Sequence, residues 1–164
     1  MSGLILLSSL SLAQNVSLEG AAAVLQPLIG TFEGNLSLVA FGERAAMRAR
    51  VECEVVGGGS GVSCALTGRS PGPLYVEADL FGVDALTGDI HFYAISNAGD
   101  AHDHVGAFTA SNVLDFTYAW TADGVSWAES IRFQFQADGS IVFHSLVTAD
   151  GAEAIVLAGT LAAV

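Results

Sequence analysis

The 164-residue chain contains no lysine, and its five arginines face seventeen aspartates and glutamates, which gives a formal net charge of −12. Nucleic-acid backbones and anionic lipid surfaces repel such a chain unless its cations cluster. Arg44, Arg48 and Arg50 lie close together, but Glu52 and Glu54 follow with the same strand alternation and nearly cancel their field. We therefore expect neither nucleic acid nor a membrane as a partner.

Charged residues of either sign are also scarce, at 13% of the chain, whereas hydrophobic residues make up 52%. This composition is far from that of a disordered protein, and the apolar residues are dispersed instead of gathered in a membrane-spanning run. A chain of this length can bury about 70% of its unfolded surface around a single core. The sequence predicts one domain over residues 17–164, with residues 1–16 as a signal peptide or an N-terminal extension.

The first residues contain a short apolar run, 4–12, that ends in Ser11-Leu12-Ala13 like the core and cleavage site of a secretory signal. No lysine or arginine precedes this run, although such a signal normally begins with positive charge. These two observations leave the location open between secreted or periplasmic and cytoplasmic.

Cysteine is limited to Cys53 and Cys64, which flank the glycine-rich turn 57–61. With the middle glycines as turn residues, the two cysteines stand directly opposite each other on one face, within reach of a disulfide. Export would permit that bond, whereas a cytosolic location would leave two buried thiols. The lack of CxxC spacing and of an adjacent base argues against a catalytic or metal-binding role.

Regular helix is expected only near the N-terminus. Ser17 can cap a short helix through residues 21–26, which Pro27 breaks and Gly30 ends. Beyond it, apolar and polar residues alternate, as in half-buried strands. The expected strands cover residues 32–38, 47–55, 62–69, 74–81, 90–96, 101–109, 113–120, 125–136, 140–148 and 152–161.

Asp-Gly dipeptides at 123–124, 138–139 and 150–151 separate several of these strands. Asp-Gly is a strong signal for a two-residue hairpin turn because both residues tolerate positive φ. About ten antiparallel strands in sequence order form an up-and-down meander, and closure removes its two open edges. We predict an all-β, closed antiparallel barrel wide enough for a small ligand, with a two-sheet sandwich as the alternative.

Two short motifs resemble the calycin-like small barrels, specifically the nitrobindin-like group and related bacterial domains of unknown function. Leu28-Ile-Gly-Thr-Phe-Glu-Gly34 is similar to the Leu-x-Gly-Thr-Trp-x-Gly opening of that group, with Phe32 in place of tryptophan. Gly82-Val-Asp-Ala-Leu-Thr-Gly88 is similar to its Gly-Tyr-Asp-x-x-Thr-Gly turn. The resemblance implies a calycin- or lipocalin-like barrel over residues 28 to 164. Nitrobindins bind haem through a histidine on the last strand, and residues 152–161 contain none, so the ligand carriers of the superfamily are the better analogy.

Three of the four histidines, His91, His102 and His104, fall within one expected hairpin. Because His102 and His104 are two residues apart, their imidazoles share one face of a strand. A turn centred on residues 98–99 sets His104 opposite Tyr93 and favours an outward position for the histidines. One additional turn residue reverses this result, since a register slip of one exchanges the two faces.

A second candidate face comes from the strands on either side of residues 138–139. A two-residue turn there sets His144 opposite Phe133, on a strongly apolar face that should point inward. Further members of this face are Trp127, Glu129, Phe135 and Leu157. Glu129 and His144 are its polar exceptions, and buried polar groups need partners or a ligand.

The leading functional interpretation is a non-catalytic protein that binds a small hydrophobic molecule in the barrel, without a cofactor. We expect the ligand-binding residues to be Tyr93, His102, His104, Trp127, Glu129, Phe133, Phe135, His144 and Leu157. No catalytic residue is assigned, because the chain has no phosphate-binding glycine loop before a helix and no nucleophile elbow.

The alternative is a metal- or haem-dependent enzyme or redox protein. A His-x-His strand pair can ligate Zn²⁺ when a neighbouring strand supplies a third ligand. The expected metal ligands are His102, His104 and His91, with haem or Zn²⁺ as the cofactor. His144 is an alternative to His91, and Glu129 or Asp115 can supply a carboxylate. A third interpretation is a structural or partner-binding barrel that forms a homodimer.

Overall fold

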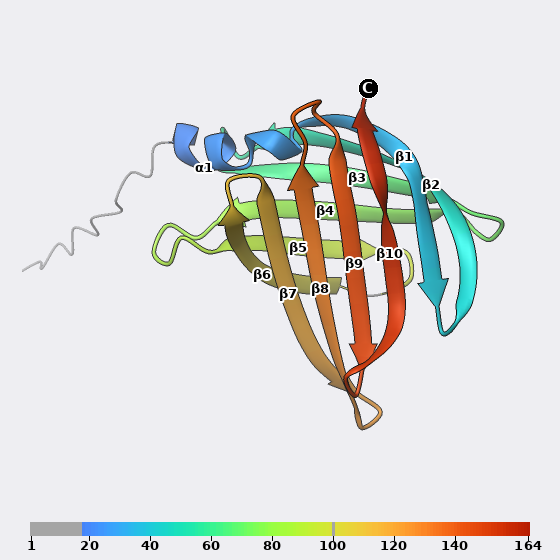
Figure 1. Ribbon diagram of the computed structural model, residues 1–164. Helices are drawn as coiled ribbons and strands as arrows, with labels where there is room; N and C mark the ends of the chain where they lie inside the picture. The colour runs from blue at the N-terminus through green and yellow to red at the C-terminus, as the bar shows by residue number, and fades with distance from the viewer. Residues whose placement is uncertain (1–17, 100) are drawn as a thin grey trace, which may run out of the picture.

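The computed structural model describes residues 18–99 and 101–164, which form a closed barrel of ten strands (Figure 1). Strands adjacent in sequence pair antiparallel, and β1 closes the barrel by pairing with β10. The strands are β1 (Gly30–Ala40), β2 (Glu43–Val56), β3 (Gly61–Arg69), β4 (Tyr75–Val83), β5 (Ile90–Ser96), β6 (Ala101–Ala110), β7 (Val113–Ala122), β8 (Val125–Phe135), β9 (Ile141–Ala149) and β10 (Ala152–Ala163). The predicted all-β, up-and-down closed barrel is confirmed, in place of the two-sheet sandwich.

Helical structure in the described residues is reduced to a short segment, α1 (Leu18–Val24), and a 3-10 turn, η1 (Gln26–Leu28). Leu25 and Leu28 are buried in the hydrophobic core, so this segment covers the barrel end near which the C-terminus lies (Figure 1). None of the helices described is long and apolar enough to cross a membrane. The expected signal peptide or extension over residues 1–16, and the expected cap Ser17, lie outside the described residues.

Two of the three Asp-Gly dipeptides form the expected two-residue turns. Asp123 and Gly124 both have positive φ, as do Asp150 and Gly151, which is what a type I′ turn requires. Ala122 accordingly pairs with Val125 across the first of these turns. Local sequence therefore determines these two connections.

The third Asp-Gly dipeptide forms a longer loop, so the expected register between β8 and β9 is wrong by one residue. Only Gly139 has positive φ, and its N–H donates to the carbonyl of Gln136. The carboxylate of Asp138 accepts hydrogen bonds from the N–H and hydroxyl of Ser140. The loop therefore has three residues, 137–139, because Ala137 belongs to it as well. His144 consequently pairs with Arg132 instead of Phe133 and faces outward.

The histidine hairpin between β5 and β6 departs from the favoured register in the same way. Gly99 has positive φ and its N–H donates to the carbonyl of Ser96, so the turn is one residue longer than assumed. His104 pairs with Phe92, and His102 pairs with Ala94. The alternative register is therefore the right one, in which the two histidines point into the barrel.

The pairing of Cys53 with Cys64 is confirmed, and the two residues form a disulfide on the inner face. Asp79 of β4 stands opposite Cys64, which sets the inward face of β4. The outer face of β4 is consequently apolar, with Val76 41% and Leu80 51% exposed. In this strand Glu77 and Asp79 line the interior, whereas Val76 and Leu80 face outside.

Aromatic side chains pack the barrel towards the end covered by η1. Phe81 and Phe92 stack with ring centroids 4.5 Å apart, and Phe116 and Phe133 meet them at steep angles. Edge-to-face and offset contacts of this kind add to the gain from burial. Phe81, Phe92 and Phe133 also border a cavity in the barrel interior.

Candidate functional site

The barrel contains a cavity of about 580 Å³ whose wall is mostly apolar. It reaches the end of the barrel that carries the β7–β8 turn, since Ala122, Asp123 and Val125 contribute to the wall. The polar side chains that line it are Tyr75, Glu77, Asp79, Ser96, His102, His104, Asp123, Glu129 and Ser145. Its volume lies within the usual range for small-molecule sites.

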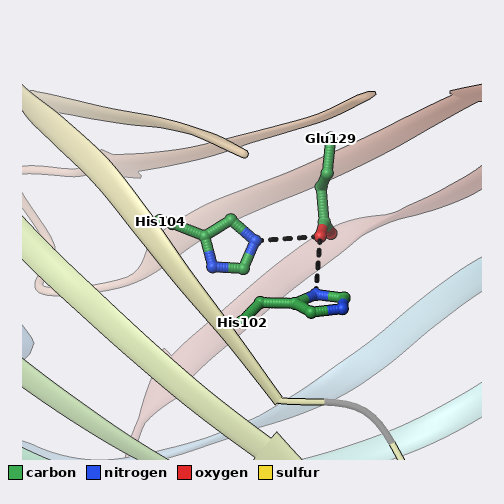
Figure 2. Close-up of side chains that lie close together, drawn as sticks. All are labelled: His102, His104 and Glu129. Carbon is green, nitrogen blue, oxygen red and sulfur yellow. Dashed lines mark hydrogen bonds and ion pairs between the residues drawn. The ribbon is translucent and has the colours of Figure 1, made fainter. Parts of the chain in front are cut away.

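One polar wall is formed by His102, His104 and Glu129, here called the His–Glu cluster. The two imidazoles extend from β6 and approach the carboxylate of Glu129, which extends from β8 (Figure 2). Nε2 of His104 lies 2.9 Å from Oε2 of Glu129, and Nδ1 of His102 lies 3.9 Å from the same oxygen. The His104 side chain is 2% exposed, His102 19% and Glu129 14%.

Two further contacts fix the orientation of this cluster. Nδ1 of His104 donates to the backbone carbonyl of Phe92 at 3.3 Å, because a carbonyl can only accept. The hydroxyl of Ser145, on β9, donates to Oε1 of Glu129 at 2.7 Å. The His104 ring and the Glu129 carboxylate are therefore each fixed by a hydrogen bond on the side away from the other, so that Nε2 and Oε2 face each other.

The surroundings of Glu129 favour its ionised form. Burial by itself raises the pKa of the Glu129 carboxyl, but the hydrogen bonds from His104 and Ser145, together with the nearby imidazoles, bring that pKa below its usual value. The carboxylate is thus charged at neutral pH. Nε2 of His104 lies within hydrogen-bond distance of this carboxylate.

A ladder of stacked rings extends from the His–Glu cluster along β7 and β8. The ring of His102 stacks on Tyr118 with centroids 4.5 Å apart, Tyr118 stacks on Trp120, and Trp120 stacks on Trp127. Trp120 and Trp127 line the cavity, and they are the two tryptophans of the chain. Tryptophan fluorescence therefore reports on this wall.

A second polar wall is formed by Glu77 and Asp79 of β4, here called the β4 acid pair. The hydroxyl of Tyr75 donates to the carboxylate of Glu77, which is also hydrogen-bonded to Asp79. Burial, and then the negative charge and hydrogen bond of Glu77, raise the pKa of Asp79 to about 9. Asp79 is therefore neutral at pH 7, and among the described residues its Oδ1 has no hydrogen-bond partner.

The structure brings six of the nine expected ligand-binding residues to the cavity wall. These six are His102, His104, Trp127, Glu129, Phe133 and Leu157. Phe135 packs against the hydrophobic core instead. The expected inward position of His144 is wrong, because the longer β8–β9 loop places this side chain on the outer surface. Tyr93 is also exposed on the outer surface, because it pairs with Asp103 and so faces away from His102 and His104.

Of the three expected metal ligands, only His102 and His104 lie close together. His91 lies on the outer surface, where its Nδ1 is 3.1 Å from the carboxylate of Asp103, because its strand parity is opposite to that of His104. Glu129 occupies the third position beside His102 and His104.

Sequence analysis missed the β4 acid pair, Ser145 and Trp120. The β4 pattern was ambiguous, because one face carries two acids with Tyr75 and the other carries aliphatic residues. The disulfide offered a signal, since Cys64 faces inward and stands opposite Asp79. That signal depends on the β3–β4 register, which the intervening loop does not determine.

Fold and cavity together define a class: an antiparallel ten-strand barrel, compatible with the calycin-like fold, that contains an internal cavity. Comparison with protein-family models finds no matching family, and comparison with curated proteins finds no matching relative.

Proposed function

We propose that this protein binds a small, largely apolar molecule inside the barrel and orients it through a hydrogen-bond donor on that molecule. The observation that carries the proposal is the cavity of about 580 Å³ with its mostly apolar wall. Such a wall gains roughly 25 cal/mol for each Å² of apolar ligand surface that it removes from water. The resemblance to nitrobindin-like barrels agrees with a ligand carrier, whereas haem has less support because β10 (Ala152–Ala163) contains no histidine.

The orienting group is Asp79. A buried acceptor without a partner costs about 1–3 kcal/mol, and a hydroxyl or amine on the ligand would supply the missing donor to Oδ1. Glu77 beside it accepts hydrogen bonds and carries negative charge, which also favours a donor over an acceptor. The preferred ligand is therefore an apolar body with one hydroxyl or amine.

Titration of the protein with 1-naphthol tests this proposal, with calorimetry and tryptophan quenching as readouts. We expect saturable binding of one molecule per chain, since Trp120 and Trp127 both line the cavity. Leu157→Phe fills the cavity and should abolish binding, whereas Leu80→Phe is the same change at an exposed position and should have no effect. Absence of saturable binding, or equal losses in the two variants, contradicts the proposal.

A matched pair of probes tests the orienting role of Asp79. 1-Methoxynaphthalene has the body of 1-naphthol but no donor. Asp79→Leu should weaken the binding of 1-naphthol by about tenfold, the equivalent of one hydrogen bond, and leave the affinity for 1-methoxynaphthalene unchanged. Equal losses of affinity for both probes would show that Asp79 does not recognise the hydroxyl donor of the ligand.

A further inference from the structure

We propose that His102, His104 and Glu129 form a binding site for a divalent transition-metal ion, with Zn²⁺ as the best match, in the wall of the cavity. One ligand atom from each residue can be chosen so that all three lie within 4.8 Å of one another. Two ligands of a tetrahedral Zn²⁺, each about 2.1 Å from the ion, are ~3.4 Å apart. The two distances to Oε2 of Glu129, 2.9 Å from His104 and 3.9 Å from His102, lie on either side of that value (Figure 2).

The chemistry of the donors selects the class of ion. Two imidazoles and one carboxylate suit zinc and neighbouring transition metals, whereas Ca²⁺ and Mg²⁺ prefer shells made of oxygen. The 3.9 Å between His102 and Glu129 is too long for a hydrogen bond, yet it suits two ligands of a shared ion.

The residues behind the cluster already hold the ligands as a metal site requires. A metal-bound imidazole normally donates its other N–H to a carbonyl or carboxylate, and a metal-bound carboxylate is normally hydrogen-bonded in turn. The donation from His104 to the Phe92 carbonyl leaves Nε2 for the ion. The hydrogen bond from Ser145 to Oε1 leaves Oε2 of Glu129 for the ion.

The position of the cluster indicates an open coordination shell. All three residues line the cavity, so an ion held by them borders the space in which a small molecule would lie. Three protein ligands leave one tetrahedral position vacant, which is the pattern of catalytic zinc sites and not of structural ones. The net charge of −12 also raises the local concentration of cations. This inference goes beyond the proposed ligand binding and does not rest on it.

Chelator-treated protein, titrated with Zn²⁺ by calorimetry and with Co²⁺ by absorption spectroscopy, tests the site. We expect one equivalent of metal per chain, with Co²⁺ bands of a four- or five-coordinate ion with nitrogen and oxygen ligands. His102→Gln, His104→Gln and Glu129→Gln should each weaken Zn²⁺ binding by about 100-fold or more. His91→Gln and His144→Gln make the same change on the outer surface and should leave the affinity unchanged.

Two results overturn the site: no stoichiometric binding by the unsubstituted chain, or losses in the outer-surface variants equal to that of His104→Gln. The Co²⁺ spectrum of the unsubstituted protein keeps the test valid if a cluster variant fails to fold. Titration of the same chelator-treated protein with 1-naphthol separates the two proposals. Naphthol binding without zinc binding overturns the metal site alone, and zinc binding without naphthol binding overturns the proposed ligand alone.

Discussion

The two polar walls of the cavity carry carboxyl groups at similar depth in opposite electrostatic surroundings. Asp79 is 7% exposed and has a second carboxyl, Glu77, as its neighbour. Glu129 has a side chain that is 14% exposed and has two imidazoles and a hydroxyl as neighbours. The pKa of Asp79 is raised to about 9, whereas the pKa of Glu129 is lowered.

This difference shows that burial alone does not decide the charge of an interior carboxyl. Burial is the largest influence on both groups and disfavours the charged form in each case. Donors and imidazoles reverse its effect at Glu129, and a like-charged neighbour adds to it at Asp79. The cavity therefore contains a neutral acid, Asp79, with an unpaired acceptor oxygen, and a carboxylate, Glu129, whose negative charge favours a cation.

The largest expected effect concerns Asp79 and the pH dependence of stability. A carboxyl whose pKa is raised by folding destabilises the protein as pH rises, because the unfolded chain releases the proton first. Between the ordinary carboxyl range and about pH 9, the free energy of unfolding should fall by about 1.4 kcal/mol per pH unit. Relative to the wild type, Asp79→Asn should therefore gain on the order of 4 kcal/mol between about pH 5 and pH 8.

Urea denaturation across this pH range measures the effect, with chelator present. The groups opposite Asp79 on the neighbouring strands are Cys64, which is held in the disulfide, and Ala94, so neither titrates. Asp103→Asn, an exposed position on the outer face, is the matched control and should show no such gain. A constant difference between Asp79→Asn and the wild type would contradict the raised pKa.

Removal of His104 should have the next largest effect on stability. Here the loss comes from an ionised carboxylate that loses its partner, whereas at Asp79 it comes from a neutral acid that must ionise. His104→Ala leaves a buried carboxylate with one hydroxyl donor, which should cost about 3 kcal/mol at pH 7 and raise the pKa of Glu129. Denaturation of a double-mutant cycle with Glu129→Gln measures the coupling. An equal cost in the Glu129→Gln background would mean that packing, and not charge, accounts for the loss.

Ser145→Ala should have an intermediate effect. The substitution removes a hydrogen bond to a charged group, which is worth about 1.5 kcal/mol, and raises the pKa of Glu129. Chemical denaturation at pH 7 checks the value, with Ser130→Ala at an exposed position as the control. No loss in Ser145→Ala would show that His104 alone stabilises the carboxylate.

The smallest effects are expected from the two outward-facing histidines. His91 makes an exposed contact with Asp103, and His144 is exposed on β9, so His91→Gln and His144→Gln should each change stability by less than about 0.5 kcal/mol. Thermal or chemical denaturation measures both. A loss close to that of His104→Ala would remove the distinction between inner and outer histidines.

The barrel itself was predictable from the sequence because strand alternation and turn residues are local properties. The type I′ turns at Asp123-Gly124 and Asp150-Gly151 follow from positive φ at both residues. The loop at Gly139 contains the same Asp-Gly dipeptide, but Asp138 does not take positive φ, and this loop, like the one at Gly99, gains a residue. The two alternatives differ by one residue, and that difference decides which side chains face the cavity.

The residues of the candidate site could be predicted from the sequence, but their arrangement in space could not. His102, His104 and Glu129 were all candidates from their spacing and from the polarity of their strands. Their convergence depends on three strands, β6, β7 and β8, having a common register, which no single hairpin determines. The inward position assigned to His144 was wrong because the β8–β9 loop is one residue longer than a two-residue turn.

By itself, the sequence determined an all-β chain of about ten strands, its closure into a barrel and the opposition of Cys53 and Cys64. These features follow from period-two alternation, from the cost of open sheet edges and from turn chemistry. Only the tertiary structure decided which histidines lie inside and how the two walls set the charges of Asp79 and Glu129. The physical reason is that a register shift of one residue leaves the strand pattern almost unchanged but exchanges every inner side chain for an outer one.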